Sequence, residues 1–262
     1  MSRVAVLAPH PDDEVLGCSS VLMEHDVTVV HVTDGVPPNV TGKAASALRV
    51  AREQEALDAC MELGARVERV VTLDAHDQEL WSHTDDVAHD LAQLLSDLRV
   101  EAVFAPAFQS GHPDHDGLYV AAQLTRRELA ALAEIDWQCY ALYALDERGR
   151  PGYGWLHSGL FPHVDERVFS PEEIERKARA LRCFVTQVSP GSVVQSWLDA
   201  PTNERFAPLP PIEARVPLLR SYYDEVFRFG EQGIERGKVD RVLRAALAEP
   251  CWPTTRPSTS TR

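Results

Sequence analysis

The sequence predicts an α/β fold with a mostly parallel sheet and flanking helices. Three observations support this prediction. Short apolar segments alternate with longer amphipathic segments of helical period over residues 4–132. The first segment, residues 4–8, is apolar throughout, as in strands covered on both faces. Polar clusters directly follow two of the segments, which is where open parallel sheets form their sites. We therefore expect a Rossmann-like N-terminal half with right-handed strand–helix–strand connections.

The strands are predicted from runs of β-branched and other apolar residues. They are expected at residues 4–8, 27–33, 67–73, 102–106 and 138–145. Residues 146–165 and 189–217 contain helix-breaking prolines and glycines and are expected to be irregular, the second as a lid or rim. Residues 216–229 are expected to mix strand and helix.

The helices are predicted from apolar residues at helical spacing and from their end signals. They are expected at residues 15–24, 44–63, 85–98, 118–132, 171–184 and 231–248. Gly64 is expected to end the second helix. Ser170, followed by Pro171 and Glu173, is a strong start signal for the fifth.

Length and charge limit the classes of protein to consider. The 262 residues predict a single domain over residues 1–249 and a polar, flexible tail at 250–262. The net charge of −14 argues against binding to nucleic acid or to anionic membrane surfaces. Five scattered cysteines, with no signal peptide and no membrane span in the sequence, predict a soluble, cytoplasmic protein with reduced thiols. The oligomeric state stays open.

Two motifs carry the predicted chemistry. HPDDE at residues 10–14 follows the first strand, and HPDH at residues 112–115 follows the strand at 102–106. Carboxylates this close together repel one another unless a divalent cation lies among them. We expect both motifs to close on one metal ion, since a catalytic zinc ion takes three protein ligands and keeps one open position. The same ligands suit Fe²⁺, Mn²⁺ or Co²⁺.

These motifs are similar to those of the PIG-L/LmbE-like metal-dependent deacetylases. The resemblance implies that His10, Asp13 and His115 bind zinc. It also implies that Asp12 is the general base and that His112 is a general acid or oxyanion stabiliser. Weaker matches to family motifs follow at Arg52 to Gly64, Lys177 to Gln187 and Tyr223 to Phe227.

The resemblance also implies that Arg52 and Asp77 contact substrate. The family often has Asp-Gly where this chain has Asp77-Gln78. In amide hydrolysis Asp12 can carry a proton from water to the leaving amine. A cationic His112 can neutralise the tetrahedral oxygen. Asp114 either orients a histidine or caps a helix.

The expected function is zinc-dependent hydrolysis of an N-acyl group, most simply the N-acetyl group of a glucosamine-type sugar or its conjugate. The sugar comes from the resemblance. The alternatives are an amidase acting on a larger thiol-sugar or natural-product conjugate, and a catalytically silent sugar-binding protein of the same fold. The sequence lacks the GxGxxG turn that a nucleotide-binding oxidoreductase needs after its first strand, which argues against that class. Neither motif is flanked by the cluster of basic residues that a phosphoesterase with one metal ion would need, which argues against that class.

Other candidates are interpreted as structural. His31 lies inside a predicted strand and is expected to be a core residue, as is the ring of Tyr143. Trp81 lies in a presumed rim loop, where it either stacks on a sugar or anchors the loop.

Overall fold

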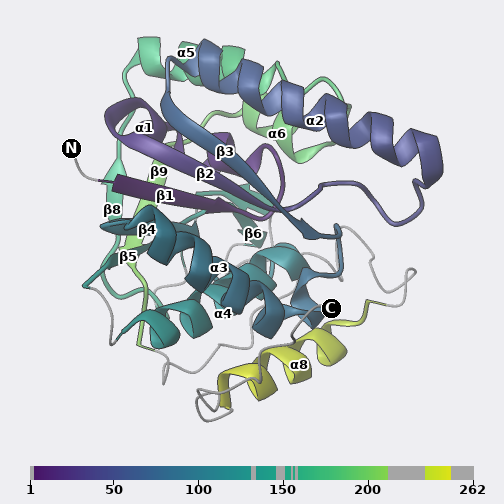
Figure 1. Ribbon diagram of the computed structural model, residues 1–262. Helices are drawn as coiled ribbons and strands as arrows, with labels where there is room; N and C mark the ends of the chain where they lie inside the picture. Colours follow the sequence, from purple (N-terminus) through teal and green to yellow (C-terminus); the bar gives the residue numbers. More distant parts are fainter. Residues whose placement is uncertain are drawn as a thin grey trace.

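The predicted α/β fold is confirmed. A computed structural model of the chain describes residues 3–130, 134–145, 151–154, 156, 159–211 and 234–248. Seven strands form one sheet in the order β3–β2–β1–β4–β5–β9–β8 (Figure 1). The first five are mutually parallel, β9 is antiparallel to β5, and β8 is antiparallel to β9. The strands are β1 Arg3–Ala8, β2 Asp26–Thr33, β3 Arg66–Ala75, β4 Ala102–Pro106, β5 Asp136–Tyr140, β8 Asp165–Arg167 and β9 Glu204–Pro208. A separate antiparallel pair consists of β6 Tyr143–Leu145 and β7 Pro151–Tyr153.

Helices cover both faces of the sheet. They are α1 Asp13–Glu24, α2 Gly42–Leu63, α3 Thr84–Leu98, α4 Pro113–Leu129, α5 Pro171–Leu181, α6 Val193–Asp199, α8 Arg236–Ala248 and the short 3₁₀ helix η1 Leu80–Ser82. In Figure 1, α1, α2, α5 and α6 lie on one side of the sheet, and α3, α4 and α8 on the other. Strand β1 serves both cores, because Val4 and Val6 pack into one and Ala5 and Leu7 into the other. None of the described helices is long and apolar enough to span a bilayer.

The strand order creates a crevice between β1 and β4. These two strands pair in parallel, with Val6 opposite Phe104. The sheet continues from β1 toward β2 on one side and from β4 toward β5 on the other. Ligand sites of open parallel sheets lie at such a switch point, beyond the carboxyl ends of the strands. Both sequence motifs follow these two strands.

Helix α4 begins at Pro113, five residues earlier than expected. The His112 ring accepts a hydrogen bond from the backbone N–H of Asp114 at 3.2 Å, so His112 is the N-cap. Proline at the first helical position needs no hydrogen-bond acceptor. The second motif therefore lies on the first turn of a helix.

The prediction of a single strand at residues 138–145 is wrong. Strand β5 ends at Tyr140, and the next two N–H groups leave the parallel pairing. Ala141 donates to the carbonyl of Arg205 at 3.0 Å, and Leu142 donates to the side chain of Gln109 at 2.7 Å. The chain then turns into β6, whose first residue is Tyr143.

The prediction of irregular structure at residues 189–217 is also wrong in part, because α6 and β9 lie within this segment. Helix α5 has the expected capping box at Ser170 but ends at Leu181 rather than 184. Helix α8 begins at Arg236, and residues 231–233 of the helix predicted there lie outside the described residues. The segment predicted at 216–229, the family match at Tyr223 to Phe227 and the tail at 250–262 lie outside the described residues.

A buried ion pair supports an interruption in α1. Cys18 has non-helical angles, with φ of −133° and ψ of 23°. The Glu204 carboxylate of β9 accepts the backbone N–H groups of the next two residues, at 2.7 and 3.0 Å. Lys177 of α5 donates to Glu204 and to the carbonyl of Leu16, both at 2.7 Å. Burial lowers the pKa of Lys177, while Glu204 opposes that shift.

We expect Glu204→Ala to lower the free energy of unfolding by about 3–5 kcal/mol, because it leaves a buried ammonium without its partner. Urea denaturation measures this loss. Glu62→Ala is the matched control: Glu62 and its partner Arg179 are both about half exposed, so we expect a loss of about 1 kcal/mol or less. Equal losses in the two variants would contradict the structural role of Glu204.

Candidate metal centre

The two motifs meet above the ends of β1 and β4. His10 follows β1, and His112 and His115 belong to the start of α4. The His10 ring centroid lies 4.7 Å from that of His112 and 5.4 Å from that of His115. The His112 and His115 rings are 5.2 Å apart. Residues about 100 positions apart in the chain therefore form one cluster, as expected.

Asp13 lies close to a ring nitrogen of each of the other two predicted ligands. Asp13 Oδ2 is 3.1 Å from His10 Nδ1 and 3.2 Å from His115 Nε2. Tetrahedral zinc with ligands at about 2.0–2.1 Å separates its ligand atoms by about 3.3–3.4 Å. Asp13 and His115 are 2% and 1% exposed, and His10 is 8% exposed. The donors thus have the chemistry, spacing and dry surroundings of a metal site.

The second ring nitrogen of His10 faces two further carboxylates. His10 Nε2 lies 3.1 Å from Asp77 Oδ1 and 3.3 Å from Asp114 Oδ2. Metal-binding histidines commonly donate their other N–H to a carboxylate, which fixes the ring orientation. Among the described residues, two sets of donor atoms lie within 4.8 Å of one another, and neither includes Asp13: the three histidines, and His10 with Asp77 and Asp114.

Asp12 has a strained backbone. Its φ of 137° is rare for a residue with a side chain, and it occupies the N-cap position of α1. Its N–H donates to Glu14 Oε2 at 3.0 Å, and His31 Nε2 lies 3.3 Å from the same oxygen. Glu14 and His31 are both fully buried. The expected core position of His31 is confirmed, and together the two side chains support the turn that carries Asp12.

Burial and neighbouring charges shift the pKa values of the carboxyl groups in opposite directions. Burial raises the pKa of Asp12 well above its ordinary value, and the charge of Asp13 raises it further. Burial also opposes ionisation of Asp13, but His115 and His10 hold the pKa of Asp13 far below its ordinary value. Asp77 is buried too, and His10 lowers its pKa to about 2. Despite burial, Asp77, Asp114 and Asp13 together raise the pKa of His10 well above its ordinary value.

His112 differs from the cation expected from the sequence. Burial, followed by the charges of His10 and His115, lowers the pKa of His112 well below its ordinary value, so the neutral ring is favoured. Because His112 Nδ1 accepts the N–H of Asp114, the proton of the neutral ring lies on Nε2. His112 is thereby set up as a neutral hydrogen-bond donor.

Arg52 and Asp77 both line a cavity of about 280 Å³ together with His10, Asp12 and His112. Arg52 also has structural partners: it donates to the carbonyl of Gly35 and, at 3.1 Å, to Gln187 Oε1. The Gln187 amide in turn donates to the Pro11 carbonyl at 3.3 Å. Arg52 therefore braces the HPDDE loop as well as facing the cavity.

Sequence reasoning missed several residues of the cavity wall. Tyr143, interpreted as a core ring, is buried but also lines the cavity, and its ring lies 4.9 Å from that of His115. Gln187 ends a segment that resembles a family motif, but the resemblance implies no role for it. Residues 192–194, at the start of α6, line the cavity and confirm only the expectation that the 189–217 segment forms part of a rim. The Ser192 cap, which accepts the N–H of Gln195, was the local signal for α6.

The segment that contains both motifs is similar to a known protein family. Residues 5–125 match the model of the PIG-L family, described as GlcNAc-PI de-N-acetylase. The matched segment runs from β1 into α4 and contains both motifs. Over this segment the chain is similar to the PIG-L family. No curated protein sequence matches the chain significantly.

Several solved structures share the fold of this chain. The zinc-inhibited form of teicoplanin deacetylase Orf2 matches with a TM-score of 0.55 and 18% identity, over 79% of this chain and 97% of that chain. N,N′-diacetylchitobiose deacetylase from Pyrococcus horikoshii matches with a TM-score of 0.54 and 22% identity, over 75% and 74%. A conserved protein from Thermus thermophilus matches with a TM-score of 0.56 and 23% identity, over 84% and 100%.

Proposed function

We propose that this protein is a metal-dependent N-deacetylase that releases the acetyl group of an N-acetylated amino sugar or of a conjugate of such a sugar. One observation carries the proposal: Asp13 lies between His10 and His115, and Asp12 and His112 line the same cavity. The amino sugar is supported by the PIG-L family description and by the names of the similar deacetylases.

We assign His10 Nδ1, Asp13 and His115 as the metal ligands. This choice leaves His10 Nε2 to donate a hydrogen bond to Asp77 or Asp114, which orients the ring. In the alternative set, Asp114 Oδ2 would bind the ion while also accepting the backbone N–H of Gln78 at 2.5 Å. Two imidazoles and one carboxylate are the donors of many catalytic zinc sites, and they also suit Fe²⁺, Mn²⁺ or Co²⁺.

The remaining side chains supply acid–base chemistry. When bound, the metal ion would polarise the acyl carbonyl and make a water molecule more acidic. Asp12 accepts a proton from the attacking water and then delivers it to the leaving nitrogen. The Nε2–H of neutral His112 donates a hydrogen bond to the oxygen that develops negative charge. Arg52, which lines the same cavity as Asp12, is a candidate contact for sugar hydroxyls.

Metal removal and return test this proposal. We expect the protein as purified to release acetate and free amine in equal amounts from N-acetylglucosamine or N,N′-diacetylchitobiose. Chelation should abolish the release, and added zinc or iron should restore it, because the metal is needed for attack on the carbonyl. Enzymatic determination of acetate measures both states.

Binding of these sugars by the metal-loaded protein without acetate release would contradict the proposal. That result would favour a sugar-binding protein without catalytic activity. Isothermal titration calorimetry under the same conditions detects such binding.

A further inference from the structure

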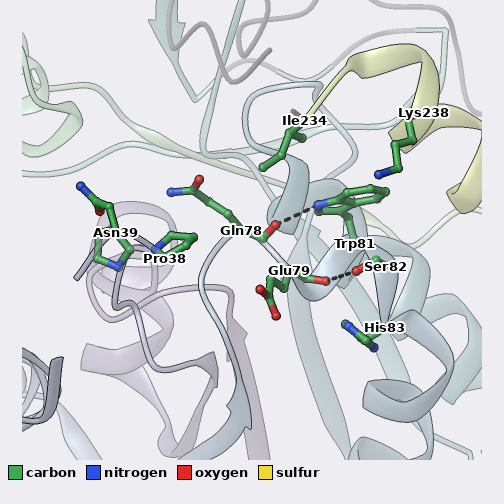
Figure 2. Close-up of a pocket in the computed structure, with 10 residues that line it drawn as sticks. Pro38, Asn39, Gln78, Glu79, Trp81, Ser82, His83, Ile234 and Lys238 are labelled. Atoms are coloured by element: carbon green, nitrogen blue, oxygen red, sulfur yellow. Dashed lines mark hydrogen bonds between the residues drawn. The ribbon is translucent and has the colours of Figure 1, made fainter. Parts of the chain in front are cut away.

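A second, larger cavity lies beside the metal centre. It has a volume of about 720 Å³ and is bounded by the loop after β2, by the loop after β3 with η1, and by the start of α8 (Figure 2). The two cavities share the loop after β3, since Asp77 lines the first and the next residue, Gln78, lines the second. Neighbouring residues of one loop therefore line the two cavities.

Gln78 has a backbone conformation that favours glycine. Its φ is 68°, in the left-handed region. Its N–H donates to Asp114 Oδ2 at 2.5 Å, and its carbonyl accepts the indole N–H of Trp81 at 2.9 Å. A glycine would make both of these hydrogen bonds with less strain. The backbone role of this position therefore does not account for the glutamine side chain.

The side chain of Gln78 points into the second cavity. Figure 2 shows its amide extending away from Trp81 toward Asn39. The Gln78 Oε1 atom is buried, and none of the described residues donates a hydrogen bond to it. A buried acceptor without a donor costs free energy, as does a left-handed residue with a side chain, and such costs concentrate at functional sites.

The wall of the cavity favours an uncharged, hydroxyl-bearing group. The Gln78 amide extends toward Asn39, Ser82 also lines the cavity with its hydroxyl on the Glu79 carbonyl at 2.8 Å, and Pro37 and Pro38 add apolar surface. The charges of Glu79 and Lys238 are opposite in sign and give the cavity no strong preference for an ion. Amides beside apolar surface suit the hydroxyl groups and C–H faces of a sugar ring.

We infer that Gln78 is a specificity-determining residue whose amide binds a second sugar ring attached to the N-acetylated one. This inference rests on the proposed function and deepens it, because it assigns the enzyme a substrate longer than one sugar. The metal cavity receives the acetylated ring, and the cavity beside Gln78 receives the ring joined to it.

The variant Gln78→Gly tests this inference in the full chain loaded with zinc. We expect the ratio of kcat/KM for N,N′-diacetylchitobiose to that for N-acetylglucosamine to fall about fivefold or more, which is the loss of one or two hydrogen bonds. The Kd for diacetylchitobiose, measured by calorimetry, should rise by a similar factor. Because glycine relieves the left-handed strain, Tm should stay the same or rise by about 2 °C. Gln78→Asn, whose shorter amide also tolerates positive φ, should lower the same ratio.

Arg99→Gly is the matched control. Arg99 is an exposed residue with φ of 53° at the end of α3, so its replacement relieves the same kind of strain far from either cavity. We expect this variant to have the wild-type ratio of kcat/KM values for the two sugars and the wild-type Kd for diacetylchitobiose. Wild-type values of both in Gln78→Gly and Gln78→Asn would overturn the inference. Absence of acetate release from either sugar would instead count against the proposed function, and the Kd comparison would still decide the role of Gln78.

Discussion

Asp12→Asn is expected to keep its metal ion and to lose about 10³-fold in kcat for acetate release, within the range of about 10²–10⁴ for a lost general acid–base. The carboxylate of Asp12 is the proposed proton carrier, and the amide cannot accept the water proton. Asparagine tolerates positive φ better than most residues, and the Asp12 side chain makes no cap hydrogen bond to α1 that the change would remove, so the fold should be preserved. Metal analysis and the acetate assay on one preparation measure the two properties together.

Asp34→Asn is the control for Asp12→Asn. Asp34 follows β2 at the same edge of the sheet, where its carboxylate accepts the N–H of Val36, a bond that asparagine can also accept. We expect this variant to hydrolyse substrate near the wild-type rate. Near-normal turnover in Asp12→Asn would rule out Asp12 as the base, and loss of metal in that variant would indicate that Asp12 is a ligand.

His10→Ala and Asp13→Ala are expected to weaken zinc binding by more than about 100-fold, because each removes a direct ligand. Asp114→Asn, which changes only a partner of His10, should weaken it by about 10–100-fold. In the wild type, zinc affinity should fall as the pH is lowered through the raised pKa of His10, since a proton then competes with the ion. Competition with a chromophoric chelator measures each affinity.

His76→Ala is the control for metal binding. His76 also lies at this edge of the sheet, but its side chain is 70% exposed and contacts Asp34 rather than the cluster. We expect its zinc affinity to match that of the wild type. Full zinc loading of His10→Ala and Asp13→Ala at limiting zinc would contradict the assignment of ligands.

The strands and motifs were predictable because their signals are local. The β-branched runs gave β1, β2 and β4 to within a residue or two. The switch point explains why the motifs after β1 and β4 meet. The start of α4 was missed because histidine is not a usual helix cap, although Pro113 was a valid signal at the first helical position.

The rest of the cavity depends on contacts between distant parts of the chain. Tyr143 reaches His115 only because the chain leaves β5 at Ala141, whose N–H pairs with β9. Gln187 joins the site through Arg52 and Pro11, which lie far away in sequence. The seven-residue α6 is too short to show helical periodicity. The neutral state favoured for His112 follows from its burial beside two other histidines, which the sequence does not show.

Crystals of the zinc-loaded protein, with anomalous scattering recorded at the zinc edge, test the central claim most directly. We expect one peak at about 2.0–2.2 Å from His10 Nδ1, a carboxylate oxygen of Asp13 and His115 Nε2. A zinc ion bound by Asp77 and Asp114 without Asp13, or His10 and His115 directed away from each other, would contradict it.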